Sequence, residues 1–312
     1  MTVCHIGTLP FEQMGKITRD IYLRCEGIHV YRLLSSKILP YANIYVLHCF
    51  KNHHKEFINF KRPHNNCKII SLVHSSYPCM PAKDSDCVVT LTNYWREKLL
   101  KEKKIDSQVI YGGIEIPDIK ADLENKWFGR IVRDDKGKFH PAWNRIAKRI
   151  LNAVPEARMY IISNNVKKKL KHLRAIYNSD IKINDEKNKM IHLAELSVAV
   201  FAHGSFEEVF PMAVLECMAV GLPIVYLYQP SMREMVDGQF DCHTIKDLYK
   251  WTCRLLKDNG LKKWYSVLSL NRARFFSLDK MVSSWNKLFQ EVYNGYTTTK
   301  SGTNKSYKGY RG

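Results

Sequence analysis

SVAVFAHGSFEEVFPMAVLECMAVGLPIVYLYQPSMREMVD is the sequence of residues 197–237. Its order of apolar and polar residues is the main indication of the fold class. It opens with an apolar run, 197–202, long enough for a buried strand, and a second such run spans 223–228. Between them Pro211 suits the first position of a helix, because it gives up only an amide that the helix leaves unpaired, and Gly221 can end that helix in a left-handed cap. Strand, loop, helix and strand in this order predict a parallel sheet covered on both faces.

Two acids lie before and inside the expected helix. Glu216 is charged in an otherwise apolar segment, and an unpaired buried carboxylate is costly, so it needs a partner. One interpretation is a salt bridge to a nearby Arg or Lys. The other starts from Glu208, just before a helix N-terminus whose free amides and positive dipole end suit a phosphate. Acids on both sides of a phosphate cradle would accept hydroxyl groups, which is the layout of a nucleotide sugar.

A family resemblance follows from Glu208-x7-Glu216, Ala219-Val-Gly-Leu-Pro-Ile-Val225 and Glu234-Met-Val-Asp-Gly238. This pattern resembles the signature of retaining GT-B glycosyltransferases of the GT4 type (glycosyl transferases group 1). The resemblance implies that Glu208 touches the donor sugar and that Glu216 holds the ribose. Val209 stands where the family usually has Gly. The positions between the acids that the resemblance assigns to donor binding are Val209, Phe210, Pro211 and Met212.

Two cations stand near the start of the expected second domain, which begins with Trp127-Phe-Gly-Arg130. Arg130 offers a planar fork of donors and Lys136 a mobile point charge, and both suit a diphosphate. In a basic protein they could equally be solvated surface charges. They match the family's G-R…K-G phosphate clamp, which implies a functional role in binding and catalysis. The resemblance also places Asn184, at the end of a strand expected over 180–184, near the base.

Residues 1–121 read as strands separated by helical segments, which predicts a doubly wound sheet. His74 ends one strand, and ligands of parallel sheets bind beyond the carboxyl ends of strands. A satisfied loop histidine is the alternative. The resemblance places His74 against the donor sugar and Gly15 where the backbone approaches the diphosphate. The strand candidates are Val3–Ile6, Ile28–Leu33, Ile44–Cys49, Cys67–Val73, Cys87–Leu91 and Gln108–Tyr111.

The expected architecture is α/β of the GT-B type: two Rossmann-like domains facing across a cleft. Residues 1–121 form the acceptor-side domain, to which a closing helix at about 280–293 returns. Residues 122–279 form the nucleotide-sugar domain, and the polar segment 116–126 links the two. Residues 294–312 are rich in Gly, Ser, Thr and Lys, which predicts a disordered basic tail.

Composition limits the function classes. The chain has 312 residues and a net charge of +19, which favours an anionic partner such as a phosphorylated substrate, acidic lipid or nucleic acid. No apolar run is long enough to span a membrane, and no signal peptide is recognisable. Nine cysteines without metal-like spacing fit a reducing compartment. We therefore expect a cytoplasmic protein, with peripheral contact to an anionic membrane surface compatible with its charge.

The leading hypothesis is sugar transfer from a nucleoside diphosphate sugar with retention at the anomeric carbon. Arg130, Lys136 and the amides before Met212 would stabilise the leaving diphosphate, so no metal or other cofactor is expected. The acceptor is open: a glycan, a lipid, a protein or modified DNA. The alternatives are a nucleic-acid-binding protein, a DNA-modifying glucosyltransferase that uses the basic surface, and a non-catalytic relative.

Overall fold

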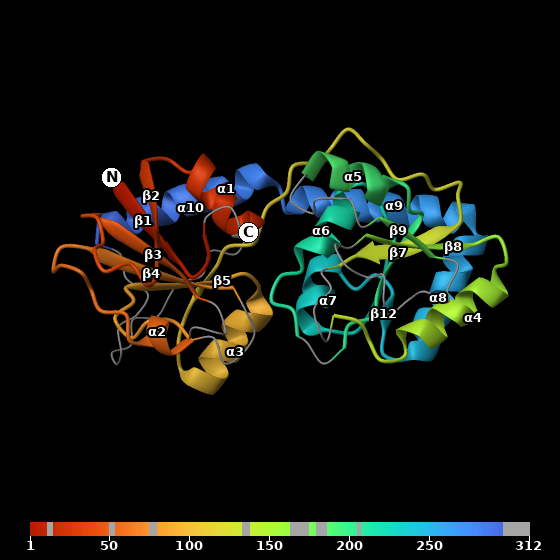
Figure 1. The fold of residues 1–312 in the computed structure, drawn as a ribbon, viewed down its shortest axis with the longest axis horizontal. Helices are drawn as coiled ribbons and strands as arrows, with labels where there is room; N and C mark the ends of the chain where they lie inside the picture. The colour runs from red at the N-terminus through yellow and green to blue at the C-terminus, as the bar shows by residue number, and fades with distance from the viewer. Residues whose placement is uncertain are drawn as a thin grey trace, which may run out of the picture. The chain divides into compact units, whose positions relative to one another are not determined.

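The computed structural model describes residues 1–10, 15–49, 54–74, 80–132, 138–162, 175–178, 186–204 and 207–295 (Figure 1). They form two compact units. The first unit runs to Ile110 and takes in the returning chain from Val282, while the second comprises Tyr111–Met281. Each unit contains one six-stranded sheet, and each is described by itself.

The sheet of the first unit is parallel, in the order β2-β1-β3-β4-β5-β6. Figure 1 shows α1 and most of α10 on one face of this sheet, with α2 and α3 on the other. Side chains alternate between the two faces along a strand. Cys4, Ile6 and Leu47 therefore share one face of the sheet, where they belong to a core cluster with Phe57 of α2 and Leu99 of α3. The elements are β1 (Thr2–Gly7), α1 (Lys16–Arg24), β2 (Ile28–Leu33), β3 (Ile44–Cys49), α2 (His54–Ile58), β4 (Lys68–Val73), β5 (Cys87–Thr90), α3 (Asn93–Lys103), β6 (Gln108–Val109) and α10 (Leu278–Tyr293).

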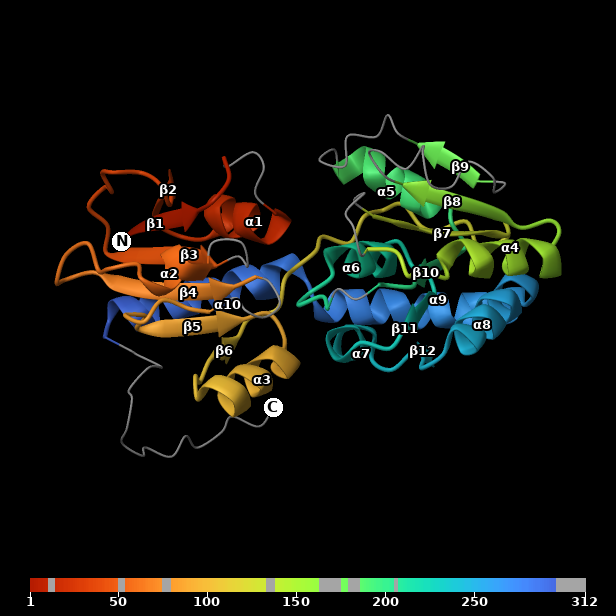
Figure 2. The ribbon, with the colours of Figure 1, turned by 60° about the horizontal axis from the view of Figure 1, so that its bottom comes forward.

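The sheet of the second unit is also parallel, in the order β12-β11-β10-β7-β8-β9 (Figure 2). Helices α4 and α8 cover one face, where Trp143, Ile146 and Leu248 join a core with Phe128 and Val200. The strand order reverses direction between β7 and β10, which is the position where open parallel sheets bind ligands. The elements are β7 (Trp127–Ile131), α4 (Trp143–Ala153), β8 (Arg158–Ile162), β9 (Ala175–Asn178), α5 (Glu186–Ala194), β10 (Val198–Phe201), α6 (Met212–Ala219), β11 (Ile224–Leu227), α7 (Pro230–Val236), β12 (Asp241–Cys242), α8 (Ile245–Lys257) and α9 (Asn259–Phe275).

The predicted doubly wound arrangement is confirmed in both units. The helix expected after Pro211 is α6, and its residues from Val214 to Ala219 are all buried. Pro211 itself is the N-cap, one position before the expected first helical residue. Gly221 has a φ of +84°, and its amide donates to the Met218 carbonyl at 3.0 Å, as a left-handed cap requires.

The boundary between the units differs from the predicted one at residue 121. Residues from Tyr111 onward pack on the second unit: the Tyr111 hydroxyl donates to Glu234 at 2.8 Å, and Ile114 bridges to Ser277. The Ala121 amide donates to the Val220 carbonyl at 2.8 Å. These hydrogen bonds fasten the expected linker to the sheet and helices of the second unit.

Two predicted features lie wholly or mostly outside the described residues: the strand at 180–184 and the tail at 294–312. Helix α9 was not foreseen. Its buried positions include Lys262, Ser266 and Ser269, so it lacks the apolar stripe by which a helix is found in a sequence. Every helix in the described part of the chain is too short or too polar to cross a membrane.

Gly129 offers a test of the close packing in the second sheet. It lies opposite Tyr160 of β8, and an added Cβ would overlap the Tyr160 carbonyl oxygen. We predict that Gly129→Ala lowers the free energy of unfolding by about 1–3 kcal/mol or more, as overpacking does, in urea denaturation. The control is Gly260→Ala in α9, where the added Cβ meets only Asp258 Oδ1 at 3.4 Å. Equal stability of the Gly129 variant and the unmodified chain would contradict this packing.

Candidate active site

Arg130 lies at the carboxyl end of β7, beside the point where the strand order reverses. Its residue is 2% exposed, and its Nη1 donates to the carbonyl oxygens of Lys138 at 3.2 Å and Ala202 at 3.4 Å. The guanidinium lies 5.0 Å from the ring of Phe201 and 5.3 Å from that of Phe139. Burial lowers the pKa of Arg130 to about 10, and the charge of Glu208 opposes this shift. A charged guanidinium is therefore held in an apolar setting.

His203 follows the neighbouring strand β10, and the positive charge of Arg130 acts on its ring. It is 4% exposed, and its ring stacks on Phe201 at 6.0 Å. Burial, and then the charges of Arg130 and Lys138, hold its pKa well below the ordinary value, so the ring is neutral. Neither ring nitrogen of His203, nor Arg130 Nε, has a hydrogen-bond partner among the described residues. Buried polar atoms without partners are rare and point to an absent water, ion or ligand.

Glu208 is the only predicted sugar contact of the second unit, and Lys138 forms an ion pair with it. Both side chains are mostly buried, at 12% exposed for Lys138 and 16% for Glu208. The backbone of Glu208 is fixed from α7: its amide donates to Gln229 Oε1 at 3.3 Å, and its carbonyl accepts from the Ser231 hydroxyl. The loop before α6 is thus held from two sides, with the carboxylate against a lysine.

Glu216 forms a salt bridge with a lysine, as one of its two interpretations predicted. Lys189 of α5 donates to its Oε1 at 2.6 Å, and each residue is 5% exposed. This pair lies inside the second unit, between α5 and α6. The ribose role assigned to Glu216 stays a prediction, and a ribose would have to share the carboxylate with Lys189.

The other predicted donor-binding positions fall into two groups. Val209 and Phe210 are buried at 3% and 7%, and Phe210 packs on Tyr111 and Phe276, so their side chains belong to the core. Pro211 is also buried and Met212 half-buried, where the chain enters α6. Backbone amides, not side chains, are what this segment can offer. Lys136 and Asn184 lie outside the described residues.

In the first unit, His74 directly follows β4, as predicted. Its Nε2 lies 2.9 Å from Nδ1 of His48, a buried histidine of β3. Burial lowers the pKa of His74 to about 3, so the ring is a neutral donor and acceptor. Gly15 is the N-cap of α1 with an extended backbone, and an added Cβ would meet nothing within 4 Å. Neither local space nor backbone conformation requires glycine there.

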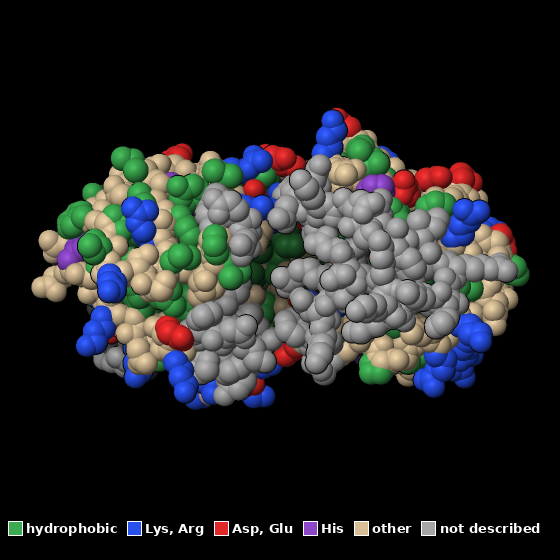
Figure 3. Space-filling view, in the orientation of Figure 1, with side chains coloured by type: hydrophobic (Ala, Val, Ile, Leu, Met, Phe, Trp, Pro, Cys, Tyr) green, Lys and Arg blue, Asp and Glu red, His purple; other side chains and the backbone are tan. Residues whose placement is uncertain are grey.

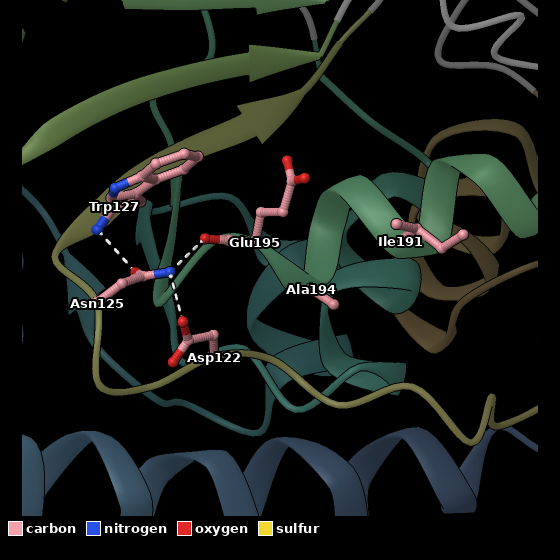
Figure 4. A pocket seen from close by; sticks show the side chains of 6 residues that line it. All are labelled: Asp122, Asn125, Trp127, Ile191, Ala194 and Glu195. Carbon is pink, nitrogen blue, oxygen red and sulfur yellow. Dashed lines mark hydrogen bonds between the residues drawn. The ribbon is translucent and has the colours of Figure 1, made fainter.

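A separate hollow of about 360 Å³ opens where α5 ends near the start of β7 (Figure 4). Asn125 is one of the residues that line it; its side chain donates to the Glu195 carbonyl at 2.6 Å and accepts from the Trp127 amide at 3.0 Å. Those hydrogen bonds attach the segment before β7 to the end of α5. The hollow contains none of the predicted site residues; its lining is Asp122, Asn125, Trp127, Ile191, Ala194 and Glu195.

Residues 127–258 match the family model of glycosyl transferases group 1. The matched segment runs from the first residue of β7 past the end of α8, and it contains Arg130, Glu208 and Glu216. The predicted resemblance is thereby confirmed at the level of this family. Retention and the GT4 type stay predictions. A search of curated proteins by sequence found no match.

Several solved structures share the fold of this chain. S. aureus TarM, as a mutant in complex with fondaparinux, alpha-GlcNAc-glycerol and UDP, is 15% identical with a TM-score of 0.62, over 79% of this chain and 55% of TarM. Anabaena HepE in complex with UDP and glucose is 10% identical with a TM-score of 0.68, over 93% of this chain and 100% of HepE. The chain thus spans about half the length of TarM. With the two parallel-sheet units, these similarities show a GT-B fold.

Trehalose 6-phosphate synthase from Burkholderia multivorans is a further similar structure. It is 11% identical, with a TM-score of 0.61 over 84% of this chain and 73% of the synthase. The predicted nucleic-acid alternative finds no support in any of these similarities.

Sequence reasoning missed three residues of the site. Lys189 is one lysine in a polar segment, and nothing in its spacing marks it as the partner of Glu216. Lys138 follows the K-G pair directly, and its place next to the predicted clamp was a usable signal. His203 comes two residues after the last residue of β10, at a strand end like the one that drew attention to His74.

The buried pair gives a prediction on stability. We expect Glu216→Gln to leave the buried charge of Lys189 without a charged partner. The free energy of unfolding should fall by about 3–5 kcal/mol. Lys189→Met should have a similar effect, and combining the two substitutions should recover part of the loss because neither charge stays buried. Urea denaturation of the single and double variants measures the coupling. Strictly additive losses would rule out the pair as a stabilising interaction.

A second prediction concerns pH. His5, His48 and His74 are neutral in the folded first unit because burial lowers their pKa values, to about 3 for His74, below the ordinary 6.5. The unfolded chain therefore binds more protons below pH 6.5, and stability must fall as pH decreases from 6.5 toward 3. Urea denaturation at pH 7 and pH 5 should show lower stability at pH 5. Equal stability at the two values would mean that these rings are not buried.

Proposed function

We propose that the chain transfers a sugar from a nucleoside diphosphate sugar to an acceptor, with retention at the anomeric carbon. The observation that carries this proposal is the set of buried, unpartnered nitrogens of Arg130 and His203 at the switch point of a group 1 glycosyltransferase region. An anion bound there would receive hydrogen bonds that no described residue now accepts. TarM and HepE were solved with UDP, which is the ligand class proposed for this chain.

The reaction needs charge stabilisation more than proton chemistry at the donor. As the bond from the anomeric carbon to the diphosphate breaks, negative charge grows on the leaving oxygen. Arg130 and the amides at the start of α6 would meet that charge in a buried, preorganised setting, where such interactions are strongest. Lys136 is assigned the same role by resemblance. This supply of positive charge is the reason to propose transfer without a metal.

Glu208 would act on the sugar itself. Its carboxylate is paired with Lys138, so sugar hydroxyls would compete with the lysine for its oxygens. Release of Lys138 from Glu208 would add a cation beside the diphosphate. His74 of the first unit is proposed to contact the sugar, and Glu216 the ribose.

The acceptor stays open among glycan, lipid, protein and modified DNA. Figure 3 shows Lys and Arg side chains at several separate places on the face that it draws, some of them close together, among acidic and apolar side chains. The coloured side chains of that face do not form a single basic stripe, which is the feature that would favour nucleic acid as the partner. Peripheral contact with an anionic membrane surface remains a proposal that rests on the net charge of +19.

A donor screen tests this function. UDP, GDP, UDP-glucose, UDP-GlcNAc and GDP-mannose should be compared for their effect on the melting temperature. A donor at 100 times its dissociation constant stabilises the fold by about 2.7 kcal/mol. Glu208→Gln should keep the stabilisation by the bare diphosphate and slow transfer from the matching sugar nucleotide. Transfer should survive EDTA.

The control for Glu208→Gln is Glu207→Gln, which changes the neighbouring acid of the same loop. Loss of bare-nucleotide binding in the Glu208 variant alone would contradict its assignment to the sugar. Complete loss of transfer in EDTA, restored by magnesium or manganese, would contradict the proposed charge stabilisation. No stabilisation by any nucleotide would overturn the proposed function.

A further inference from the structure

His203 is a buried residue whose ring makes no hydrogen bond with the described part of the chain. It follows β10, it is 4% exposed, and its ring stacks on Phe201 with the centroids 6.0 Å apart. Neither Nδ1 nor Nε2 has a partner among the described residues. Most buried polar atoms are satisfied, because each has lost its water on folding. A ring with two unsatisfied nitrogens therefore indicates a place where a ligand supplies the partners.

Two cations act on this ring from the neighbouring strand and the segment after it. Arg130 lies near the end of β7, Lys138 follows β7 in the chain, and both charges lower the pKa of His203. The Arg130 guanidinium donates to two backbone carbonyl oxygens, which carry no full charge. Lys138 is paired with Glu208 from the loop before α6. Positive charge thus faces the ring, and the acid of the site is already in an ion pair.

The other titratable groups beside the ring do not supply a negative charge to it. His140 lies beside Ala202, whose carbonyl accepts the His140 amide at 2.9 Å, and its own Nδ1 accepts a backbone amide at 3.0 Å. Cys217 of α6 lies close enough to act on Arg130, and burial raises the pKa of its thiol, so the thiol is uncharged. Within the described ranges, the charges that act on the ring are those of the two cations.

Hydrogen-bond chemistry decides which form of the ring fits an anion. A neutral imidazole has one N–H donor and one acceptor nitrogen, whereas the cation has two donors. The oxygens of a deprotonated diphosphate only accept hydrogen bonds, so they satisfy N–H groups and cannot satisfy the acceptor nitrogen of a neutral ring. When that nitrogen binds a proton, both sides of the ring become donors. The same proton places a positive charge beside the diphosphate.

A histidine suits this place better than a further permanent cation would. A lysine or arginine beside Arg130 would add repulsion between like charges to the cost of burying its own charge. A neutral imidazole avoids both costs in the folded chain. It gains its charge only when the negative charge of a bound anion raises its pKa.

We propose that His203 is a ligand of the diphosphate group that takes up one proton from water when the anion binds and returns it when the anion leaves. The identity of the anion, a sugar nucleotide and then its nucleoside diphosphate product, rests on the proposed function. The acceptor nitrogen of the ring forms one new N–H bond, and no other covalent bond of the chain changes. One proton enters with each anion and leaves with it, so the ring is neutral again after every cycle.

Linkage gives this proton uptake a definite sign. Without an anion the pKa of His203 lies well below 6.5, and the negative charge of a bound diphosphate raises it. Affinity for the anion therefore increases as pH falls through the pKa of the anion-bound ring, and it levels off below the pKa of the ring without anion. One linked proton changes the dissociation constant by at most about tenfold per pH unit.

The first test measures proton uptake in the full chain by calorimetry. UDP-glucose is the probe, because its diphosphate is esterified at both ends and lacks the phosphate ionisation with a pKa of about 6. Its binding at pH 7, measured in buffers with different ionisation enthalpies, gives the number of protons bound with it. Uptake should be clear in the unmodified chain and in the control His243→Gln, and absent in His203→Gln. His243 is an exposed histidine of the same unit that stacks on Tyr228.

The second test follows affinity with pH. Between pH 8 and pH 6 the dissociation constant of UDP-glucose should fall on the order of tenfold in the unmodified chain, and it should stay constant in His203→Gln. At pH 8 the two proteins should bind with similar affinity, because the glutamine amide also donates to an anion. A merely structural role of His203 would instead weaken binding equally at both pH values.

Inorganic sulfate tests the site without a nucleotide. NMR of the full chain labelled with 15N-histidine should show a neutral His203 ring at pH 7 and a cationic ring at saturating sulfate. The signals of this ring are identified by their absence from the spectrum of His203→Gln, or of His203→Asn if the glutamine variant does not fold. The calorimetry of the unmodified chain needs neither variant.

The outcomes separate this proposal from the proposed function. Binding of UDP-glucose without proton uptake, or uptake that persists in His203→Gln, would overturn the role of His203 even in an active glycosyltransferase. A ring that stays neutral with both sulfate and UDP-glucose would overturn it as well. A cationic ring with sulfate, in a chain that binds no nucleotide, would support the proton uptake and overturn the proposed function.

Discussion

A buried positive charge is the constraint on which the second unit depends. The guanidinium of Arg130 is enclosed by two aromatic rings and two carbonyl oxygens. Glu208, whose charge acts on Arg130, is already paired with Lys138. Burying a charge is costly unless partners satisfy it. Gly129 lets β8 approach so closely that the strand end carrying Arg130 is fixed. An anion bound at this edge would supply the partner that Arg130 Nε and His203 lack. The same contacts that bind the anion would then offset the cost of burying the charge of Arg130.

The sequence predicted those parts of the fold in which burial and hydrophobicity coincide. The strand Ile44–Cys49 and the helix after Pro211 are apolar and buried, so pattern and structure agree. Helix α9 fails this test because lysine and serine occupy its buried positions. Lys262 is accommodated there because its Nζ donates to the Asn125 carbonyl at 2.9 Å. Such a partner lies 137 residues away in the chain, and no local pattern encodes it.

Site residues were predictable where a motif fixes a position on a strand end or a helix start. Arg130, Glu208 and His74 stand at carboxyl ends of strands or in the loops that follow, as expected for parallel sheets. What motifs do not give is the partner of each charge. Glu216 was recognised as needing one, but Lys189 comes from a different helix, and Lys138 reaches Glu208 across the sheet edge. Pairings of this kind are set by tertiary packing, which a single sequence does not display.

The two units bury ionisable groups with a different balance of charge. In the second unit full charges are buried in pairs, Lys189 with Glu216 and Lys138 with Glu208, beside the neutral ring of His203. In the first unit the rings of His5 and His48 are kept neutral by desolvation, and the buried charge of Asp20 is paired with Lys16. A charged pair can exchange one partner for a phosphate or a hydroxyl, whereas a neutral imidazole carries no net charge that would attract an anion. The buried positive charge that an anion would meet is therefore that of Arg130, in the second unit.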